Sequence, residues 1–294
     1  MRAFRDRVAV VTGGASGIGR AMAERFAAEG MKLVLADVEE AALERTAGEL
    51  AGRGAEVLGV RTDVSKAGDV EDLARRALAR FGAVHVVCNN AGVTVGNTVW
   101  GHSLEDWEWV LGVNLWGVIH GLRSFVPILL EQGDEGHVVN TASMSGLIGL
   151  PYAAIYHASK HAVVTISESL HYELALQGAK VKASVLCPGF VRTPILNGER
   201  NRPAELRGEA AALPSGWDAM EKSYQEWIEN AVGPEYVAEL VLEAIRAEKF
   251  WILPHPAGKA WIRRHAEDIL EERNPVFDAS LLDGVTAPPT RKRG

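Results

Sequence analysis

The 294-residue sequence contains only two cysteines, Cys88 and Cys187, and both lie in apolar runs. We therefore expect two reduced core residues and no disulfide framework. Positive charge is also in short supply, because 31 Lys and Arg face 38 Asp and Glu, for a formal net charge of -7. This balance argues against a broad electrostatic attraction to nucleic acid or to an anionic membrane surface.

Other features of the chain are missing as well. No apolar run approaches the length of a membrane span, and no apolar region with a cleavage site is visible near the N-terminus. We expect no contact with a membrane and a cytoplasmic location. Repeats and low-complexity linkers are absent, so residues 1–294 are predicted to form a single domain. Within it, residues 190–233 are interpreted as a lid insertion and residues 254–294 as a C-terminal extension.

What the chain does contain is an alternation of short β-branched runs with helical periodicity. The runs predict strands at residues 7–12, 32–37, 55–62, 84–90, 136–143, 180–187 and 249–253. Helices are predicted at residues 17–29, 39–50, 67–81, 104–130 (one or two), from Tyr152 onward, 234–248 and 259–272. Such alternation predicts an α/β fold, a doubly wound parallel sheet of about seven strands with helices on both faces.

A glycine-rich turn separates the first strand from the first helix. Gly13, Gly17 and Gly19 are spaced as Gly-x-x-x-Gly-x-Gly, with Ser16 and Ile18 beside them. The spacing differs from Gly-x-Gly-x-x-Gly, but the physical purpose is the same. Glycines allow a tight turn and the close approach of a pyrophosphate, which the N–H groups of the helix N-terminus can bind. The turn predicts a dinucleotide site.

Asp37 ends the second strand, twenty residues after Gly17. A carboxylate there can accept hydrogen bonds from an adenosine ribose, although a helix N-cap is the alternative. In the cofactor interpretation the carboxylate repels a 2′-phosphate, and neither Ser16 nor residues 38–40 supply a compensating cation. The pattern favours NAD over NADP.

The third and fourth strands also end in candidate ligand residues, namely Asp63 and Val64 after the third strand and Asn90, Ala91 and Gly92 after the fourth. In open α/β sheets, ligands bind at the carboxyl ends of the strands. Asparagine side chains can instead join neighbouring loops, so a structural role is the alternative for Asn89 and Asn90.

Tyr156 and Lys160 are four residues apart, which places them on one face of a helix. At ~4 Å and an effective dielectric near ~20, an ammonium attracts a phenolate by about 4 kcal/mol. That attraction would bring a tyrosine pKa from ~10 toward ~7, where the phenol can exchange a proton at neutral pH. The alternative is an ordinary helix with an exposed lysine and a half-buried tyrosine.

Taken in order, the motifs resemble those of the short-chain dehydrogenase/reductase family over about residues 7–253. The resemblance is carried by Thr12-Gly13-x-x-x-Gly17-x-Gly19, Asp63, Asn89-Asn90-Ala91-Gly92, Asn114, Ser143, Tyr156-x-x-x-Lys160 and Pro188-Gly189. It implies a Rossmann-type domain that transfers a hydride between a nicotinamide and a carbon bearing a hydroxyl or carbonyl group. Two departures are Cys187, where many members carry Asn, and the longer region after Leu253.

The resemblance also implies roles. Tyr156 would be the general acid/base, Ser143 would hold the substrate oxygen, and Lys160 would bind the nicotinamide ribose and lower the tyrosine pKa. Asn114 would hold a water that links Lys160 to solvent. The adenosine and ribose side would contact Ala91 and Gly92, and the nicotinamide end would contact Pro188, Gly189, Val191 and Thr193. Family members pair the 104–130 helix and the Tyr/Lys helix, which implies a homodimer or homotetramer.

The expected substrate pocket is apolar and aromatic. Its walls are residues 93–100, residues 144–152 and a helical stripe that ends at Trp227, with candidate contacts at Val95, Met144, Tyr152, Trp217, Met220 and Tyr224. Without an evident arginine clamp, a hydrophobic secondary alcohol or ketone, aryl or alicyclic, fits best. Reduction of 3-oxoacyl thioesters and a catalytically silent NAD-binding scaffold or sensor remain alternatives.

His157 and His161 share the i, i+4 spacing of zinc ligands on a helix. No Glu lies between them and no third ligand is evident, so we expect no metal.

Overall fold

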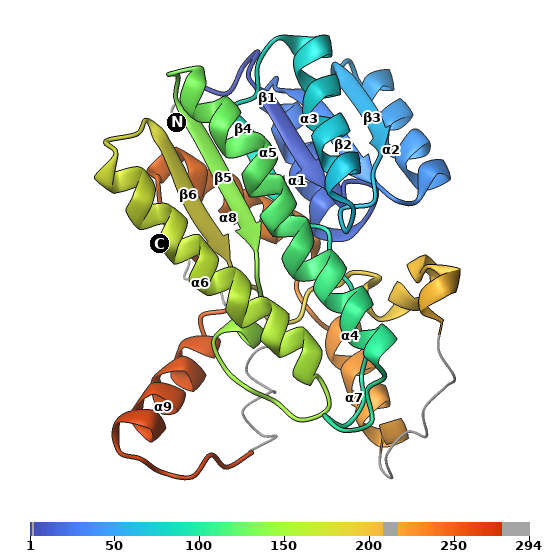
Figure 1. Ribbon diagram of the computed structural model, residues 1–294, viewed down its shortest axis with the longest axis vertical. Helices are drawn as coiled ribbons and strands as arrows, with labels where there is room; N and C mark the ends of the chain where they lie inside the picture. The colour runs from blue at the N-terminus through green and yellow to red at the C-terminus, as the bar shows by residue number, and fades with distance from the viewer. Residues whose placement is uncertain (2, 208–216, 278–294) are drawn as a thin grey trace.

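A computed structural model describes residues 1, 3–207 and 217–277, with the side chains of residues 218–220 excepted. Its centre is a parallel sheet whose strand order is β3-β2-β1-β4-β5-β6-β7 within the described residues. The strands are β1 (Val8–Thr12), β2 (Lys32–Asp37), β3 (Val57–Arg61), β4 (Val86–Asn89), β5 (Gly136–Thr141), β6 (Val181–Leu186) and β7 (Trp251–Ile252). The predicted fold class is confirmed, with helices on both faces of the sheet (Figure 1).

The helices follow the predicted alternation closely. They are α1 (Gly17–Ala28), α2 (Glu40–Gly52), α3 (Ala67–Phe81), α4 (Leu104–Leu111), α5 (Gly117–Glu131), α6 (Ala154–Leu176), α7 (Trp217–Glu229), α8 (Pro234–Ala247) and α9 (Gly258–Leu270). A π-helical turn, η1 (Gly112–Trp116), joins α4 to α5 without a break. Short 3₁₀ turns form at η2 (Met144–Gly146), η3 (Ile195–Asn201) and η4 (Ala204–Leu206).

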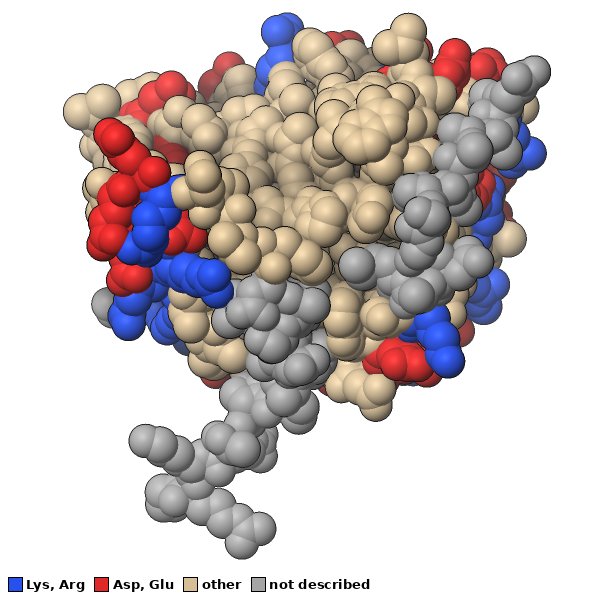
Figure 2. Space-filling view, turned by 90° about the horizontal axis from the view of Figure 1, so that it is seen from below, with Lys and Arg blue, Asp and Glu red and all other residues tan. Residues whose placement is uncertain are grey.

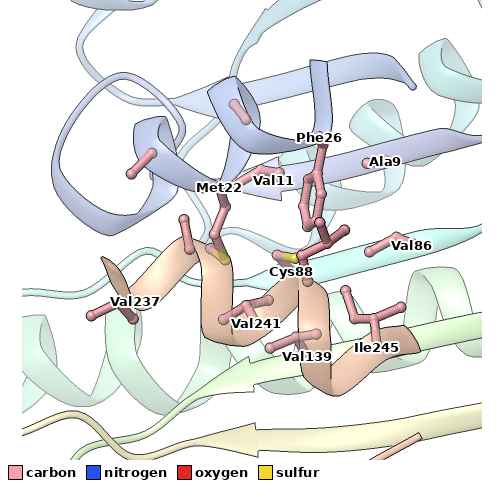
Figure 3. Packing of buried hydrophobic residues seen from close by; sticks show 14 of the residues in the cluster. Ala9, Val11, Met22, Phe26, Val86, Cys88, Val139, Val237, Val241 and Ile245 are labelled. Atoms are coloured by element: carbon pink, nitrogen blue, oxygen red, sulfur yellow. The ribbon is translucent and has the colours of Figure 1, made fainter. Parts of the chain in front are cut away.

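One core layer packs α1 and α8 on the sheet. Figure 3 shows Phe26 of α1 and Ile245 of α8 beside residues that alternate along β1 and β4. Cys88 belongs to this layer, and both cysteines are free and buried, as expected. Because consecutive strand residues point to opposite faces, the intervening positions face the second layer.

The second layer is formed by α3, α5 and α6. Val10 of β1 contacts it, together with Phe125 of α5 and Leu174 of α6. Both faces of the central strands are therefore covered, which explains why their sequences are continuous apolar runs. The strand order reverses between β1 and β4, which leaves a crevice at the carboxyl ends of these strands.

The expectation that no apolar stretch is long enough to span a membrane needs correction. Residues Leu104–Glu131 form a continuous helical stretch with a mean hydropathy of 1.4 over its best 18-residue window, and 33% of that window is buried. By length and composition alone, this one stretch among the described residues could cross a membrane. Its side chains Phe125 and Leu129 pack into the second core layer, so one face of this stretch belongs to the core of the α/β domain.

Candidate active site

A cavity of about 1130 Å³ opens at the carboxyl edge of the sheet. Figure 2 shows this face, where charged side chains gather at the margins and the centre is uncharged. The cavity collects most of the predicted site residues: Gly13, Ser16, Gly17, Ile18, Asp37, Asp63, Val64, Asn90, Ala91, Gly92, Val95, Ser143, Met144, Tyr152, Tyr156, Lys160, Pro188, Gly189, Val191, Thr193, Trp217 and Tyr224. Gly19 and Asn114 lie behind its wall, and the side chain of Met220 lies outside the described residues.

The glycine-rich turn is tight enough to require its glycines. Gly13 has a φ of 64°, and a Cβ there would lie 3.0 Å from the Ala91 Cα. Gly19 does not line the cavity. It must be glycine because the Gly13 carbonyl oxygen occupies the place of a side chain, and a Cβ on Gly19 would lie 2.1 Å from that oxygen. Gly19 thus allows helix α1 to start directly against the turn, which is an indirect contribution to the cradle.

The N-terminus of α1 suits an anion. Ser16 makes no side-chain capping bond, and the first turn carries no acidic residue. The amide donors at this end therefore remain for a ligand, and the helix dipole favours negative charge there. The residues present fit a dinucleotide pyrophosphate.

Asp37 lies at the end of β2, beside this turn. Its carboxylate accepts hydrogen bonds from the Ala15 N–H at 3.0 Å and from the Glu39 N–H at 3.1 Å. Burial raises the pKa of Asp37, and the two backbone donors lower it. Asp37 is thus a structural link between the glycine-rich turn and the start of α2, but the N-cap of α2 is Glu39, so the N-cap interpretation of Asp37 is wrong.

Asn90 is similarly structural in part. Its Nδ2 donates to the Thr12 carbonyl at 3.0 Å, and its Oδ1 accepts from the Thr141 hydroxyl at 3.2 Å. The Thr12 hydroxyl accepts from the Asn90 and Ala91 N–H groups. One side chain therefore ties the ends of β1, β4 and β5 together at the crevice.

Ser143, Tyr156 and Lys160 converge on the cavity from β5 and α6. Lys160 is 2% exposed, and its Nζ donates to the Thr141 carbonyl at 2.8 Å. The Nζ also lies over the Tyr156 ring, 5.5 Å from its centroid. Ser143 caps η2 by accepting from the Ser145 N–H at 3.1 Å.

The expected fall in the tyrosine pKa is not found. Burial raises the pKa of Tyr156 above 10.0, and only the hydrogen bond with Ser143 lowers it. Burial lowers the pKa of Lys160 to about 8. The expectation was wrong in direction because it weighed one charge pair and omitted the desolvation of both groups.

Asn114 lies in the π-helical turn and is fully buried. Its Oδ1 accepts from the Val93 N–H at 2.8 Å, and its Nδ2 donates to the Val93 carbonyl and to Ser159. A Cβ on Gly92 would lie 3.4 Å from the Asn114 Oδ1 and 3.6 Å from the Lys160 Nζ. Asn114 therefore fixes the segment that follows β4, next to the lysine.

Residues 7–204 match the family described as short chain dehydrogenase. The chain belongs to the short-chain dehydrogenase/reductase family. It is 40% identical over 268 residues to a 1-deoxy-11-beta-hydroxypentalenate dehydrogenase of Streptomyces exfoliatus. That match covers 90% of this chain and 89% of the other protein. A CLA biosynthesis dehydrogenase/reductase of Lactiplantibacillus plantarum is 33% identical over 97% of this chain and 100% of its own length.

A solved structure is similar as well. A short-chain dehydrogenase/reductase of Burkholderia phymatum in complex with NAD superposes with a TM-score of 0.92. The two sequences are 49% identical, and the match covers 95% of this chain and 99% of that one. Membership in this family makes the protein an oxidoreductase with a nicotinamide cofactor.

Beyond the family motifs, the cavity has an aromatic wall. Trp217 of α7 packs over Gly96, where a Cβ would approach its ring to 1.8 Å, and it meets Tyr152 edge-on at 6.0 Å between centroids. The Val191–Val232 bridge joins positions near the two ends of residues 190–233, the segment that the sequence predicts as a lid. Trp100 was placed on this wall by sequence but is 88% exposed, because it lies in the exposed turn at residues 99–101.

Part of this wall, contributed by α9, was not predicted from the sequence. Trp261 of α9 lines the cavity and packs with Ile148 and Phe190, and Gly258 packs on Met144 so closely that a Cβ would lie 2.7 Å from its Cε. The amphipathic pattern of α9 was visible in the sequence. Its contacts with Met144 and Ile148 could not be predicted, because those residues lie more than a hundred positions away along the chain.

His157 has a structural contact in this arrangement. Its Nδ1 contacts the carbonyl oxygens of Ser145 and Ile148 at 3.0 and 2.8 Å, and so holds the loop that follows Ser143. In the part of the chain that the structure describes, no group of three His, Cys, Asp or Glu side chains could hold a metal.

Proposed function

We propose that the protein is an NAD-dependent oxidoreductase that transfers a hydride between the nicotinamide and a hydrophobic, aryl or alicyclic, secondary alcohol or ketone. The observation that carries the proposal is the convergence of Ser143, Tyr156 and Lys160 on the cavity that also contains the glycine-rich turn. A silent scaffold would not need a buried lysine beside the tyrosine, because burying that ammonium costs stability.

In this proposal the chain's own groups handle the proton. The hydroxyls of Ser143 and Tyr156 both contact the substrate oxygen, where charge develops during the reaction. Tyr156 takes or returns the hydroxyl proton. Lys160, which the Thr141 carbonyl holds beside the Tyr156 ring, would bind the nicotinamide ribose. The cofactor, when bound, supplies the hydride chemistry.

Asp37 supports NAD rather than NADP. Its carboxylate lines the cavity next to Val38 and Glu39, so with the adenosine ribose bound at the end of β2 two acidic side chains would face a 2′-phosphate. Arg200, a cation at this corner of the cavity, is engaged with Glu39 at 2.7 Å. Like charges placed together disfavour the phosphorylated cofactor.

The substrate assignment rests on the pocket wall. Ile148, Trp217, Tyr224 and Trp261 present apolar and aromatic surface to the cavity. Burial raises the pKa of Tyr224, which keeps its phenol neutral. The relative that is named for a hydroxypentalenate supports an alcohol as the group that reacts.

We further propose a homodimer or homotetramer through α5 and α6. Tyr172 and Leu176 of α6 are 61% and 88% exposed, and Trp116, at the start of α5, is 51% exposed. Exposed apolar side chains on a helix face are typical of association surfaces. Light scattering of the wild type and of Leu176→Glu tests this, and a monomeric wild type would refute it.

The function is tested with NAD and a panel of aryl and alicyclic secondary alcohols, followed by NADH absorbance. Turnover of at least one class is expected, with 3-oxoacyl thioesters reduced more slowly. NADH binding without turnover of any panel member would favour the scaffold instead.

A further inference from the structure

His255 lies just after β7, outside every motif that the sequence analysis used. Strands β6 and β7 are parallel, and the Cys187 N–H donates to the Ile252 carbonyl at 2.9 Å. The two chain segments that leave these strands therefore run side by side. This carries His255 to the turn at residues 188–190.

Both ring nitrogens of His255 are bonded to that turn. Nδ1 accepts from the Gly189 N–H at 2.9 Å, and Nε2 contacts the Phe190 carbonyl at 2.9 Å. A peptide N–H only donates and a carbonyl only accepts, so the hydrogen must be on Nε2. The residue is 2% exposed, and burial lowers the pKa of His255, which favours the same neutral form.

The turn is also bonded to the loop that carries Ser143. The Pro188 carbonyl accepts from the Ser143 hydroxyl at 3.3 Å and from the Met144 N–H at 2.8 Å. A displacement of the turn would therefore move the hydroxyl that contacts the substrate oxygen. His255 is on the other side of the same three residues and restrains them there.

The backbone of His255 is itself restrained. Pro254 and Pro256 flank it, which limits the conformations of the segment, and the Gly258 N–H donates to the His255 carbonyl at 3.0 Å. The ring is thus presented to the turn by a rigid element at little cost in conformational entropy.

We propose that His255 is a positioning residue, which holds residues 188–190 where they contact the nicotinamide half of the cofactor and the Ser143 hydroxyl. The inference rests on the proposed function, because the position of this turn matters for turnover only if a nicotinamide binds there. It assigns the start of the C-terminal extension to the site.

The test compares two ligands across two variants. His255→Leu removes both hydrogen bonds, so NADH affinity and kcat should each fall about tenfold or more, the range for lost buried hydrogen bonds. The affinity for ADP-ribose, which lacks the nicotinamide, should stay unchanged. His255→Asn places an oxygen near the former Nδ1, so it should restore the Gly189 contact and most of kcat.

His85 provides the matched control, because its Nδ1 accepts from the Val8 N–H at 3.1 Å near the opposite ends of the strands. His85→Leu should lower thermal stability and leave kcat unchanged. Equal losses of NADH and ADP-ribose affinity in His255→Leu, or no rescue by His255→Asn, would overturn the positioning role. A wild type that binds no NADH would instead refute the proposed function.

Discussion

The ammonium nitrogen of Lys160 lies over the ring of Tyr156, one helical turn away on α6, and donates its hydrogen bond to Thr141. The Lys160 ammonium is thus held by the Thr141 carbonyl at the end of β5 and not by the Tyr156 hydroxyl. Burial lowers the pKa of Lys160 to about 8 from its ordinary 10.5. The charged lysine is therefore less favourable in the folded protein than in the unfolded chain, and its retention points to a need other than stability.

Lys160→Met should stabilise the protein while it removes activity. Below pH ~8 both folded and unfolded wild type carry the charge, so the fold bears the full penalty, roughly 3 kcal/mol for a shift of this size. Between the folded pKa and 10.5 only the unfolded lysine stays protonated, so wild-type stability rises with pH there and the advantage of the variant shrinks. Urea unfolding at about pH 7 and about pH 9.5 measures both effects.

Lys180→Met is the control for this comparison, because the exposed Lys180 also donates to a backbone carbonyl, that of Gly133, at 2.9 Å. It should change stability by less than about 0.5 kcal/mol at either pH, as surface substitutions do. A Lys160→Met protein that is less stable than wild type at neutral pH would contradict the expected desolvation penalty.

Tyr156→Phe should lower kcat by about a hundredfold or more, the usual contribution of a general acid/base. NADH affinity should stay within about twofold, because the ring and its contact with Lys160 remain. Stopped-flow turnover and fluorescence titration separate the two quantities. Tyr172→Phe, on the exposed face of the same helix, should leave both unchanged. Near-normal turnover by Tyr156→Phe would rule out the proposed proton transfer.

Local patterns predicted much of this arrangement. The bounds of β2 and α3 agree with their predicted ranges, because apolar alternation and helical periodicity are properties of neighbouring residues. The spacing of Tyr156 and Lys160 placed both on one helix face for the same reason. The resemblance to the family then identified which polar residues would meet at the carboxyl edge.

The rest depends on contacts between distant segments. The pKa of Tyr156 follows from its burial, which no spacing within α6 reveals. His255 and Trp261 reach the site only because β7 pairs with β6 and directs the C-terminal extension back over the cavity. The need for a glycine at residue 96 likewise comes from a distant residue, Trp217, whose ring packs against it.

Asp37→Asn should relax the preference for NAD over NADP by about tenfold, because one negative charge near the 2′ position is removed. Asparagine retains an acceptor for one of the two backbone donors, Ala15 or Glu39, so the turn should persist. The measurement is kcat/KM with each cofactor. Asp69→Asn is the control and should leave the ratio unchanged, since the Asp69 carboxylate also accepts a backbone N–H, that of Asp63 at 3.0 Å, but does not line the cavity. A wild type that prefers NADP would overturn the assignment of Asp37.

Gly96→Ala should change substrate selection more than stability. A methyl group at residue 96 would overlap the Trp217 ring, so the ring must leave its contact with Tyr152 and the aromatic wall must reopen. We expect KM for a bulky apolar alcohol to rise about tenfold, which corresponds to roughly 1.4 kcal/mol of lost contact, with little change for a small alcohol. Gly48→Ala, at a helix position with open space around it, should alter neither KM. Equal effects on large and small alcohols would mean that Trp217 does not form the substrate wall.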